Sequence, residues 1–153
     1  MTQREPSLEL PHSGPMRLLD RVLFHDATRT VCSADPLRAQ LFEDAEGRLP
    51  AWIALELMAQ CAAAHGALAG PERAAGAGRA LLLGARRLRL DVAALDPARP
   101  LEVEARHRAG ERGLVAFDCA LRDPAVGRTL AAGRLNVYTL RETATEAGRS
   151  DGS

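Results

Sequence analysis

One segment of the chain, residues 48–71, is apolar or small almost throughout and reads RLPAWIALELMAQCAAAHGALAGP. It is rich in strong helix formers, Pro50 stands where proline favours the start of a helix, and Gly70 and Pro71 end the run. The segment is therefore predicted to form one helix of about 20 residues, roughly 30 Å long. A helix that is apolar around most of its circumference must be covered on several sides. This requirement favours a fold in which other elements wrap around the helix.

Segments with strand character lie on both sides of this helix in the sequence. Two short strands are expected at residues 16–26 and 28–35, ahead of the helix. Longer strands are expected in residues 80–92, 100–123 and 127–140, after a Gly/Ala-rich loop. The order predicts short strands, one helix and then a run of antiparallel strands.

The clearest strand pattern lies in residues 100–123. Leu101, Val103 and Ala105 fall on one face, whereas charged residues fill the alternate positions. The sequence AGERG, at residues 109–113, predicts the turn of a hairpin. This alternation is typical of antiparallel strands with one face against a core.

These observations predict an α+β fold in which a curved antiparallel sheet wraps around one central helix. We expect a single domain over residues 1–140, followed by a polar and disordered tail over residues 141–153. The edges of an antiparallel sheet are commonly protected by pairing with a second subunit. A dimer is therefore expected.

Composition argues against several classes of protein. Twenty basic residues balance twenty acidic ones, so no strong electrostatic field favours nucleic acid or a membrane surface. Cys32, Cys61 and Cys119 are odd in number and stand in apolar surroundings, which predicts reduced thiols in a cytoplasmic protein. The N-terminal residues have no apolar core typical of a secretion signal. No motif of a metal or cofactor site is present, so neither is expected.

Glu56 is the unusual residue of the apolar segment. Helical spacing aligns Trp52, Glu56, Gln60 and Ala63 on one side of the predicted helix. Burial of a carboxylate is costly and raises its pKa, which is also how a carboxylic acid becomes a proton donor near neutral pH. The alternative is structural: Glu56 pairs with an arginine or lies at an exposed edge.

His12 is a second candidate. It lies in the turn LPHSGPM just before the first strand, where a loop can present a side chain to a cleft, although a surface role is the alternative. His25, His65 and His107 are weaker candidates. His65 lies about two and a half helical turns from Glu56, too far for a direct pair, and His107 is expected to be solvated.

The sequences LPHSGPMRLLDRV and LPAWIALELMAQ resemble the two leading motifs of the hot-dog-fold 3-hydroxyacyl-carrier-protein dehydratases. The resemblance is closer to the small dehydratase-like proteins of aryl polyene and related type II fatty-acid systems, and covers about residues 8–139. It implies a hot-dog fold, an acyl carrier protein as partner, and an active site shared between two subunits. Glu56 matches the family's catalytic acid, six positions after Pro50, and Gln60 matches the neighbouring glutamine.

One departure from this family concerns the catalytic histidine. The resemblance implies a histidine in the loop before Pro50, but residues 41–50 read LFEDAEGRLP and contain none. Elimination of water needs a base for the C2 proton and an acid for the departing hydroxyl. A histidine-containing paralogue in a heterodimer would supply the base. Alternatively, His12 acts as the base in a homodimer, Glu56 works alone in a thioesterase, or the chain is a non-catalytic, acyl-binding partner.

Further residues are expected to contact the substrate and its carrier. Ala51, in place of the family's glycine, and Trp52 lie at the predicted helix start, where N–H groups are available to polarise a thioester carbonyl. Additional helix residues are expected to line an acyl tunnel, with core packing as the alternative: Leu55, Met58, Ala59, Gln60 and Ala62.

A carrier protein is acidic, which makes Arg86 and Arg87 candidate contacts. Strand alternation predicts Arg87 and Arg89 on one face of the sheet and Arg86 on the other. A solvated sheet face is the alternative explanation for these arginines.

Overall fold

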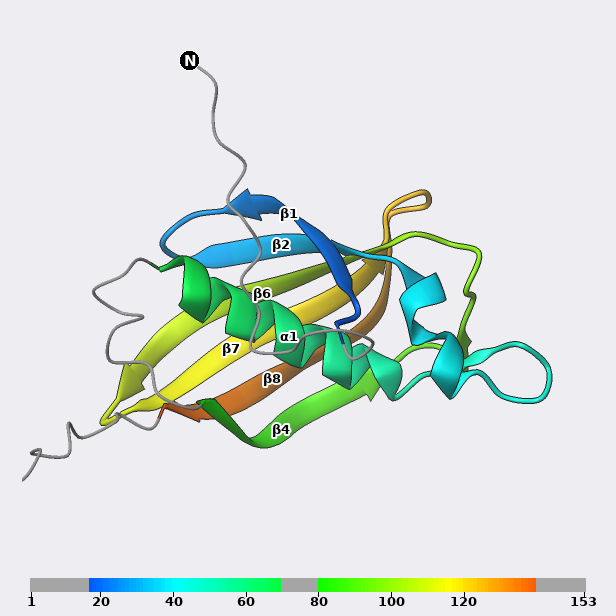
Figure 1. Cartoon of the computed structure of the whole chain (residues 1–153). Coiled ribbons are helices and arrows are strands. Elements are labelled where there is room, and N and C mark those ends of the chain that lie inside the picture. The colour runs from blue at the N-terminus through cyan, green and yellow to red at the C-terminus, as the bar shows by residue number, and fades with distance from the viewer. Residues whose placement is uncertain (1–16, 70–79, 140–153) are drawn as a thin grey trace, which may run out of the picture.

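The long apolar segment forms helix α1 (Ile53–Leu68), and an antiparallel sheet curves around it (Figure 1). The structure is a computed structural model that describes residues 17–69 and 80–139. The other elements, in chain order, are β1 (Leu19–His25), β2 (Arg29–Ala34), the 3₁₀ helix η2 (Pro36–Phe42), β3 (Leu49–Pro50), β4 (Ala80–Leu90), β5 (Ala94–Leu95), β6 (Leu101–Glu111), β7 (Leu114–Asp123) and β8 (Arg128–Thr139). The predicted α+β fold, with the hot-dog arrangement of helix and sheet, is confirmed.

The main sheet has the strand order β1-β2-β6-β7-β8-β4, and every neighbouring pair is antiparallel. Strands β1 and β4 therefore form its two opposite edges. Helix α1 packs mainly against four of the six strands, β1, β2, β6 and β7. A separate two-stranded sheet joins β3 to β5.

Alternating residues of the strands make the core. Leu101, Val103 and Ala105 of β6 are buried, as predicted, while the charged residues between them are half-buried. From the helix, Leu57 and Met58 are buried in the same hydrophobic cluster. Each fully buried side chain of this size contributes about 1.5–3 kcal/mol through removal of apolar surface from water. The sheet and one side of α1 therefore stabilise each other.

The hairpin between β6 and β7 is tighter than predicted. Strand β6 continues to Glu111, so the turn consists of Arg112 and Gly113 rather than residues 109–113. Both turn residues have positive φ, 52° and 82°, as a two-residue type I′ turn requires. Glycine at the second position accommodates this conformation without strain.

The start of the helix was also predicted incorrectly. Pro50 pairs with Ala94 in the small β3–β5 sheet, and α1 begins three residues later at Ile53. The 3₁₀ helix η2 was missed, although Asp35 and Pro36 carry its signal. The Asp35 carboxylate accepts a hydrogen bond of 3.0 Å from the Leu37 N–H, and proline occupies the first position.

Within the described ranges, no helix has both the length and the apolar character needed to cross a bilayer. Several predictions concern residues outside these ranges, namely the loop of residues 70–79, the polar tail and His12.

Candidate active site

A half-buried stripe on α1 carries Glu56. Trp52, Leu55, Glu56, Ala59 and Ala63 lie on one side of the helix because their spacing follows its period. Trp52 is exposed and the other four residues are half-buried, whereas most remaining positions of the helix are buried. The stripe is thus the side of α1 that the chain's own sheet covers least.

Gln60 fixes the position of the Glu56 carboxylate. Its Oε1 accepts a hydrogen bond of 3.0 Å from the backbone N–H of Leu18, and its Nε2 donates one of 3.0 Å to Oε1 of Glu56. A backbone N–H can only donate, so the Gln60 oxygen must face Leu18 and its NH₂ group must face Glu56. Gln60 is fully buried, and loss of its oxygen would remove the acceptor of the Leu18 N–H. Oε1 of Glu56 is therefore the acceptor of the bond from Nε2 of Gln60.

The helix terminus adds to this environment. Glu56 lies in the first turn of α1, where the partial positive charge of the helix favours a carboxylate. The N–H groups of Ala54 and Leu55 bond to the carbonyl oxygens of Ala51 and Trp52, at 3.1 and 3.0 Å. These two N–H groups are therefore not available to polarise a thioester carbonyl, although N–H groups at the helix start were expected to do so. Only N–H groups before Ala54 could take that role.

The residues predicted to contact an acyl chain separate into two groups. Leu55, Ala59 and Trp52 belong to the half-buried stripe or its exposed end. A second group is buried within the chain: Ala51, Met58, Gln60 and Ala62. Met58 and Ala62 belong to the hydrophobic core cluster, in agreement with the packing alternative for these positions.

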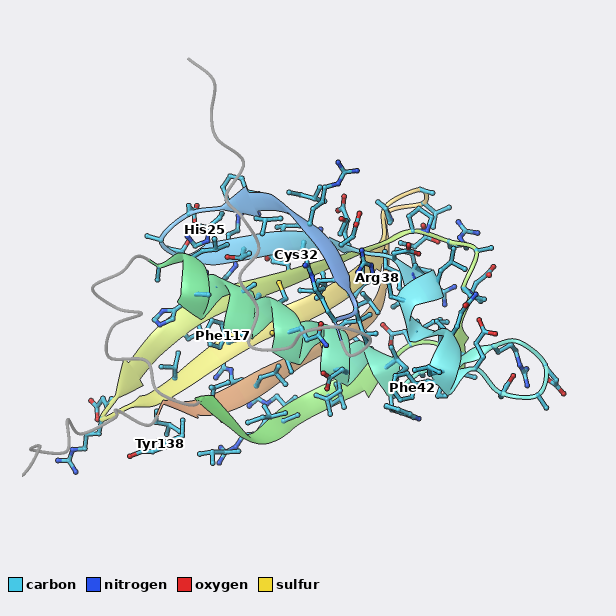
Figure 2. All side chains as sticks on the ribbon, viewed as in Figure 1. His25, Cys32, Arg38, Phe42, Phe117 and Tyr138 are labelled. Carbon is cyan, nitrogen blue, oxygen red and sulfur yellow. The ribbon has the colours of Figure 1, made fainter. Side chains whose placement is uncertain are left out.

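Beside the helix start, an aromatic pair borders the stripe. The rings of Phe42 and Trp52 meet edge to face, with centroids 5.6 Å apart. Figure 2 shows Phe42 beside the N-terminal end of α1. The contact holds η2 next to the helix start, and therefore near the turn that carries Glu56.

Three histidines gather at the other end of α1, a cluster that the sequence did not reveal. The buried Thr30 hydroxyl lies 2.7 Å from Nδ1 of His25 and 2.9 Å from Nδ1 of His65. The His65 ring stacks on His107 with a centroid distance of 5.8 Å, and Phe117 contacts both rings edge-on. His107 is half-buried and packed, so the prediction of a solvated residue was wrong.

The geometry of this cluster indicates a structural role. A hydroxyl has one hydrogen, so Thr30 donates to one Nδ1 atom and accepts from the other, which fixes complementary tautomers of His25 and His65. Nine helical residues separate His65 from Glu56, about 13 Å along the axis, so this histidine does not pair with the acid. In the described part of the chain, no three His, Cys, Asp or Glu side chains are arranged to hold a metal ion.

The arginines of β4 do not follow the predicted alternation. Arg86 is opposite Arg134 and Arg89 is opposite Ala132, so three steps on β4 match two steps on β8. The extra residue forms a β-bulge, and Arg87 has a positive φ of 53°. Arg86 and Arg89 therefore share a face, and the prediction that they lie on opposite faces was wrong.

Arg86 and Arg87 line a surface cavity of about 400 Å³ together with Asp118 and Arg134. The ion pair between Arg134 and Asp118 has an Nε to Oδ1 distance of 2.8 Å, and Arg108 contacts the same carboxylate. The Arg134 guanidinium, followed by that of Arg108, holds the pKa of Asp118 below its usual value.

The three cysteines are buried free thiols, as predicted. Sγ of Cys61 lies 3.9 Å from Sγ of Cys32, well beyond a disulfide bond length of about 2.05 Å. The neighbouring Cys32 thiol and burial raise the pKa of Cys61 well above its ordinary value, and burial raises the pKa of Cys119 to about 12. Cys61 and Cys119 are therefore poor nucleophiles at neutral pH.

Residues 5–147 match the model of a family described as ApeP-like, ApeP dehydratase. A solved structure of the dehydratase heterocomplex ApeI:P from Xenorhabdus doucetiae contains a similar chain. It is 28% identical, with a TM-score of 0.78, and the match covers 87% of this chain and 89% of that chain. None of the curated proteins is significantly similar to this sequence.

More distant structures share the fold. A hypothetical thioesterase from Streptococcus pneumoniae, solved with coenzyme A, is 10% identical with a TM-score of 0.62, over 79% of this chain and 85% of that chain. A mutant thioesterase from Pseudomonas aeruginosa is 15% identical with a TM-score of 0.60, over 79% of this chain and 81% of the other. Identities this low indicate a common fold and carry no information on activity.

Proposed function

We propose that this chain, which belongs to the ApeP-like dehydratase family, contributes Glu56 to an active site that a second subunit completes. It is a dehydratase-like subunit of aryl polyene biosynthesis, and its substrate on this proposal is a 3-hydroxyacyl thioester attached to an acyl carrier protein. The supporting observation is the hydrogen-bond chain from the Leu18 N–H through Gln60 to Glu56. These two hydrogen bonds orient the Glu56 carboxyl group on the side of α1 that the sheet covers least.

The reaction requires two groups. A base removes the C2 proton, the C2 electron pair forms the double bond with C3, and the hydroxyl leaves C3 as water after Glu56 protonates it. Gln60 donates to Oε1 of Glu56 and thereby orients the acid. Leu55 and Ala59, on the same stripe, border the acyl chain, while Trp52 and Ala51 lie next to the thioester.

The missing base supports a partner subunit. The loop from Glu43 to Arg48 has no histidine, and the histidines of the described residues gather at the other end of the helix. The 28%-identical chain belongs to a dehydratase heterocomplex, which supports a heteromeric assembly. On this proposal, the other subunit carries the histidine. His12 is the alternative base, because six residues of extended chain from Leu18 reach up to about 20 Å, enough to bring it to Glu56.

The exposed edge of the sheet supports the same proposal. Every residue from Leu82 to Leu90 is exposed, although β4 is eleven residues long and pairs with β8 along one side. Three leucines of β4 lie next to inward-facing positions of β8. Leu82 and Leu90 pair with β8 residues, Leu88 lies against Gly133, and the three side chains are 38–45% exposed. A second subunit that covers β4 would bury these leucines and satisfy the strand edge.

The test measures dehydration of a 3-hydroxyacyl thioester by the chain alone, by the partner subunit alone and by their mixture. We expect activity in the mixture, and a loss of about 10²–10⁴-fold for Glu56→Gln, which retains an acceptor for Gln60 but no acidic proton. Glu102→Gln, a half-buried glutamate on the sheet, is the matched control and should retain activity. A fully active Glu56→Gln mixture would exclude the proposed acid.

The alternatives predict different results. If His12 is the base, the isolated chain dehydrates the substrate and His12→Gln abolishes this activity. If the chain is a thioesterase, it releases free thiol without a partner. If it is a non-catalytic subunit, Glu56→Gln leaves both assembly and product formation unchanged.

A further inference from the structure

Three arginines lie around Asp20 at the start of β1, two beside its carboxylate and one at its backbone carbonyl. Nε of Arg21 lies 3.8 Å from Oδ2 of Asp20, and Nη2 of Arg38 lies 3.7 Å from Oδ1. Nη2 of Arg17 donates to the backbone carbonyl of Asp20 at 3.3 Å. We call Arg17, Asp20, Arg21 and Arg38 the Arg17 cluster. It carries three positive charges and one negative charge.

The guanidinium groups of this cluster retain donors for another acceptor. The two ion-pair distances exceed the 2.7–2.9 Å of a charge-assisted hydrogen bond, so Asp20 holds Arg21 and Arg38 only loosely. Nε of Arg17 is buried and has no hydrogen-bond acceptor among the described residues. A buried donor of this kind requires an explanation, because native proteins pair nearly all of them. The exposed guanidinium groups of Arg21 and Arg38 are the donors that a docking anion can reach.

The cluster lies beside the Glu56 site. Arg17 directly precedes Leu18, whose N–H is bound by Gln60, the residue that donates to Glu56. Arg38 lies on η2, as Figure 2 shows, and the same element contacts Trp52 through Phe42. Through these two contacts the cluster is connected to the N-terminal part of α1, which carries the proposed catalytic acid.

Two apolar side chains accompany these charges. Leu37 and Leu41 of η2 are 55% and 76% exposed, on either side of Arg38 in the sequence. Exposed leucines beside an arginine suit a surface that contacts another protein, because a small anion gains nothing from them. The combined surface suits a partner that is acidic and has apolar side chains among its carboxylates.

We propose that an acidic carrier protein docks on the Arg17 cluster and on Leu37 and Leu41 when it delivers its thioester to Glu56. This inference rests on the proposed function and names where the carrier binds. Positive charges next to the site would accelerate encounter and set the orientation of the carrier. It replaces Arg86 and Arg87 as the principal carrier contacts, because β4 is the edge of the sheet opposite β1.

The experiment measures the affinity of the full-length chain, with its partner subunit, for an acyl carrier protein. The carrier bears a hydrolysis-resistant 3-hydroxyacyl pantetheine amide, and fluorescence anisotropy reports binding. The variant Arg17→Gln/Arg38→Gln should raise Kd about tenfold or more at low salt, and the difference should shrink as salt rises. Leu37→Ser/Leu41→Ser should also weaken binding, without any change of charge.

Two double variants make the comparison specific. Arg112→Gln/Arg122→Gln removes the same charge from exposed positions of the β6–β7 hairpin, and should leave Kd unchanged. Arg86→Gln/Arg87→Gln tests the alternative surface on β4. Wild-type affinity of Arg17→Gln/Arg38→Gln, or a larger loss in the β4 variant, would overturn the proposal.

A coenzyme A thioester of the same acyl group distinguishes protein docking from phosphate recognition. If Arg17→Gln/Arg38→Gln leaves the Kd of this thioester unchanged, the arginines bind the carrier protein, as proposed. If the variant loses as much affinity for the thioester as for the carrier, the arginines bind phosphate and the docking proposal is refuted. Glu56→Gln keeps the two proposals separate. This variant should bind the carrier with wild-type affinity. Dehydratase activity in Glu56→Gln would therefore contradict the role of Glu56 as the acid without affecting the docking result.

Discussion

Nε2 of Gln60 lies 3.0 Å from Oε1 of Glu56, one helical turn away on α1. The Gln60 amide cannot reverse this bond, because its own oxygen accepts the Leu18 N–H. Replacement of Gln60 therefore affects the orientation of the acid and the attachment of β1 together.

Gln60→Leu, which preserves side-chain size, removes both hydrogen bonds. We expect the free energy of unfolding to fall by about 1–3 kcal/mol, because the Leu18 N–H loses its acceptor. Activity should also fall, through kcat rather than KM, because Glu56 loses its fixed orientation. Urea unfolding and steady-state kinetics check the two effects. Gln40→Leu, at an exposed position of η2, is the matched control, and an equal effect there would contradict this role for Gln60.

The exposed leucines of β4 are predicted to drive assembly. Leu82→Arg places a charge on a surface that a second subunit would cover, so association should weaken by about tenfold or more. Light scattering after size-exclusion chromatography measures the assembled fraction. Val126→Arg, at a residue 63% exposed in the turn between β7 and β8, should assemble normally. Assembly of Leu82→Arg at wild-type affinity would exclude β4 from the interface.

The Thr30 hydroxyl is predicted to stabilise the fold by bridging His25 and His65. Thr30→Val is close to isosteric and leaves each Nδ1 atom without this partner, so the free energy of unfolding should decrease by about 1–3 kcal/mol. Chemical denaturation measures the change. Thr129→Val, at a half-buried position of β8, is the control. Equal stability of both variants would show that the bridge contributes nothing.

Asp118 is predicted to make the stability of the protein depend on acid pH. Arg134 and Arg108 lower its folded-state pKa, so the stabilisation is present above the unfolded value of about 3.9 and is lost as pH falls through the folded value. Asp118→Asn should cost about 1 kcal/mol at pH 7, because these pairs are partly exposed, and progressively less below pH ~4. Urea unfolding at several pH values measures this difference. A cost that grows on acidification would contradict the assignment.

Much of the fold follows from local patterns in the sequence. Alternation of Leu101, Val103 and Ala105 with charged residues predicts β6 and its buried face, and both were confirmed. Local chemistry also predicts the buried free thiols. The start of α1 was wrong because Pro50 pairs with Ala94, and a contact between segments this far apart has no signal in a local window.

The site was predictable to a similar extent. The helical spacing of Trp52, Glu56 and Gln60 identifies an acid and an amide on one side of a helix, and the hydrogen bond between Gln60 and Glu56 agrees with it. The sequence could not show that the Gln60 oxygen binds Leu18, because 42 residues separate them. The bulge at Arg87 was missed for a related reason, since strand alternation assumes an unbroken register.

The exposed edge of β4 has a consequence for the synthesis of the protein. A strand with leucines on its surface and one unpaired side is a template for strand addition, and therefore for aggregation. Chains made in excess of a subunit that covers β4 would associate with each other through this strand. If a second subunit covers β4, as proposed, co-production of the two chains should therefore raise the soluble yield.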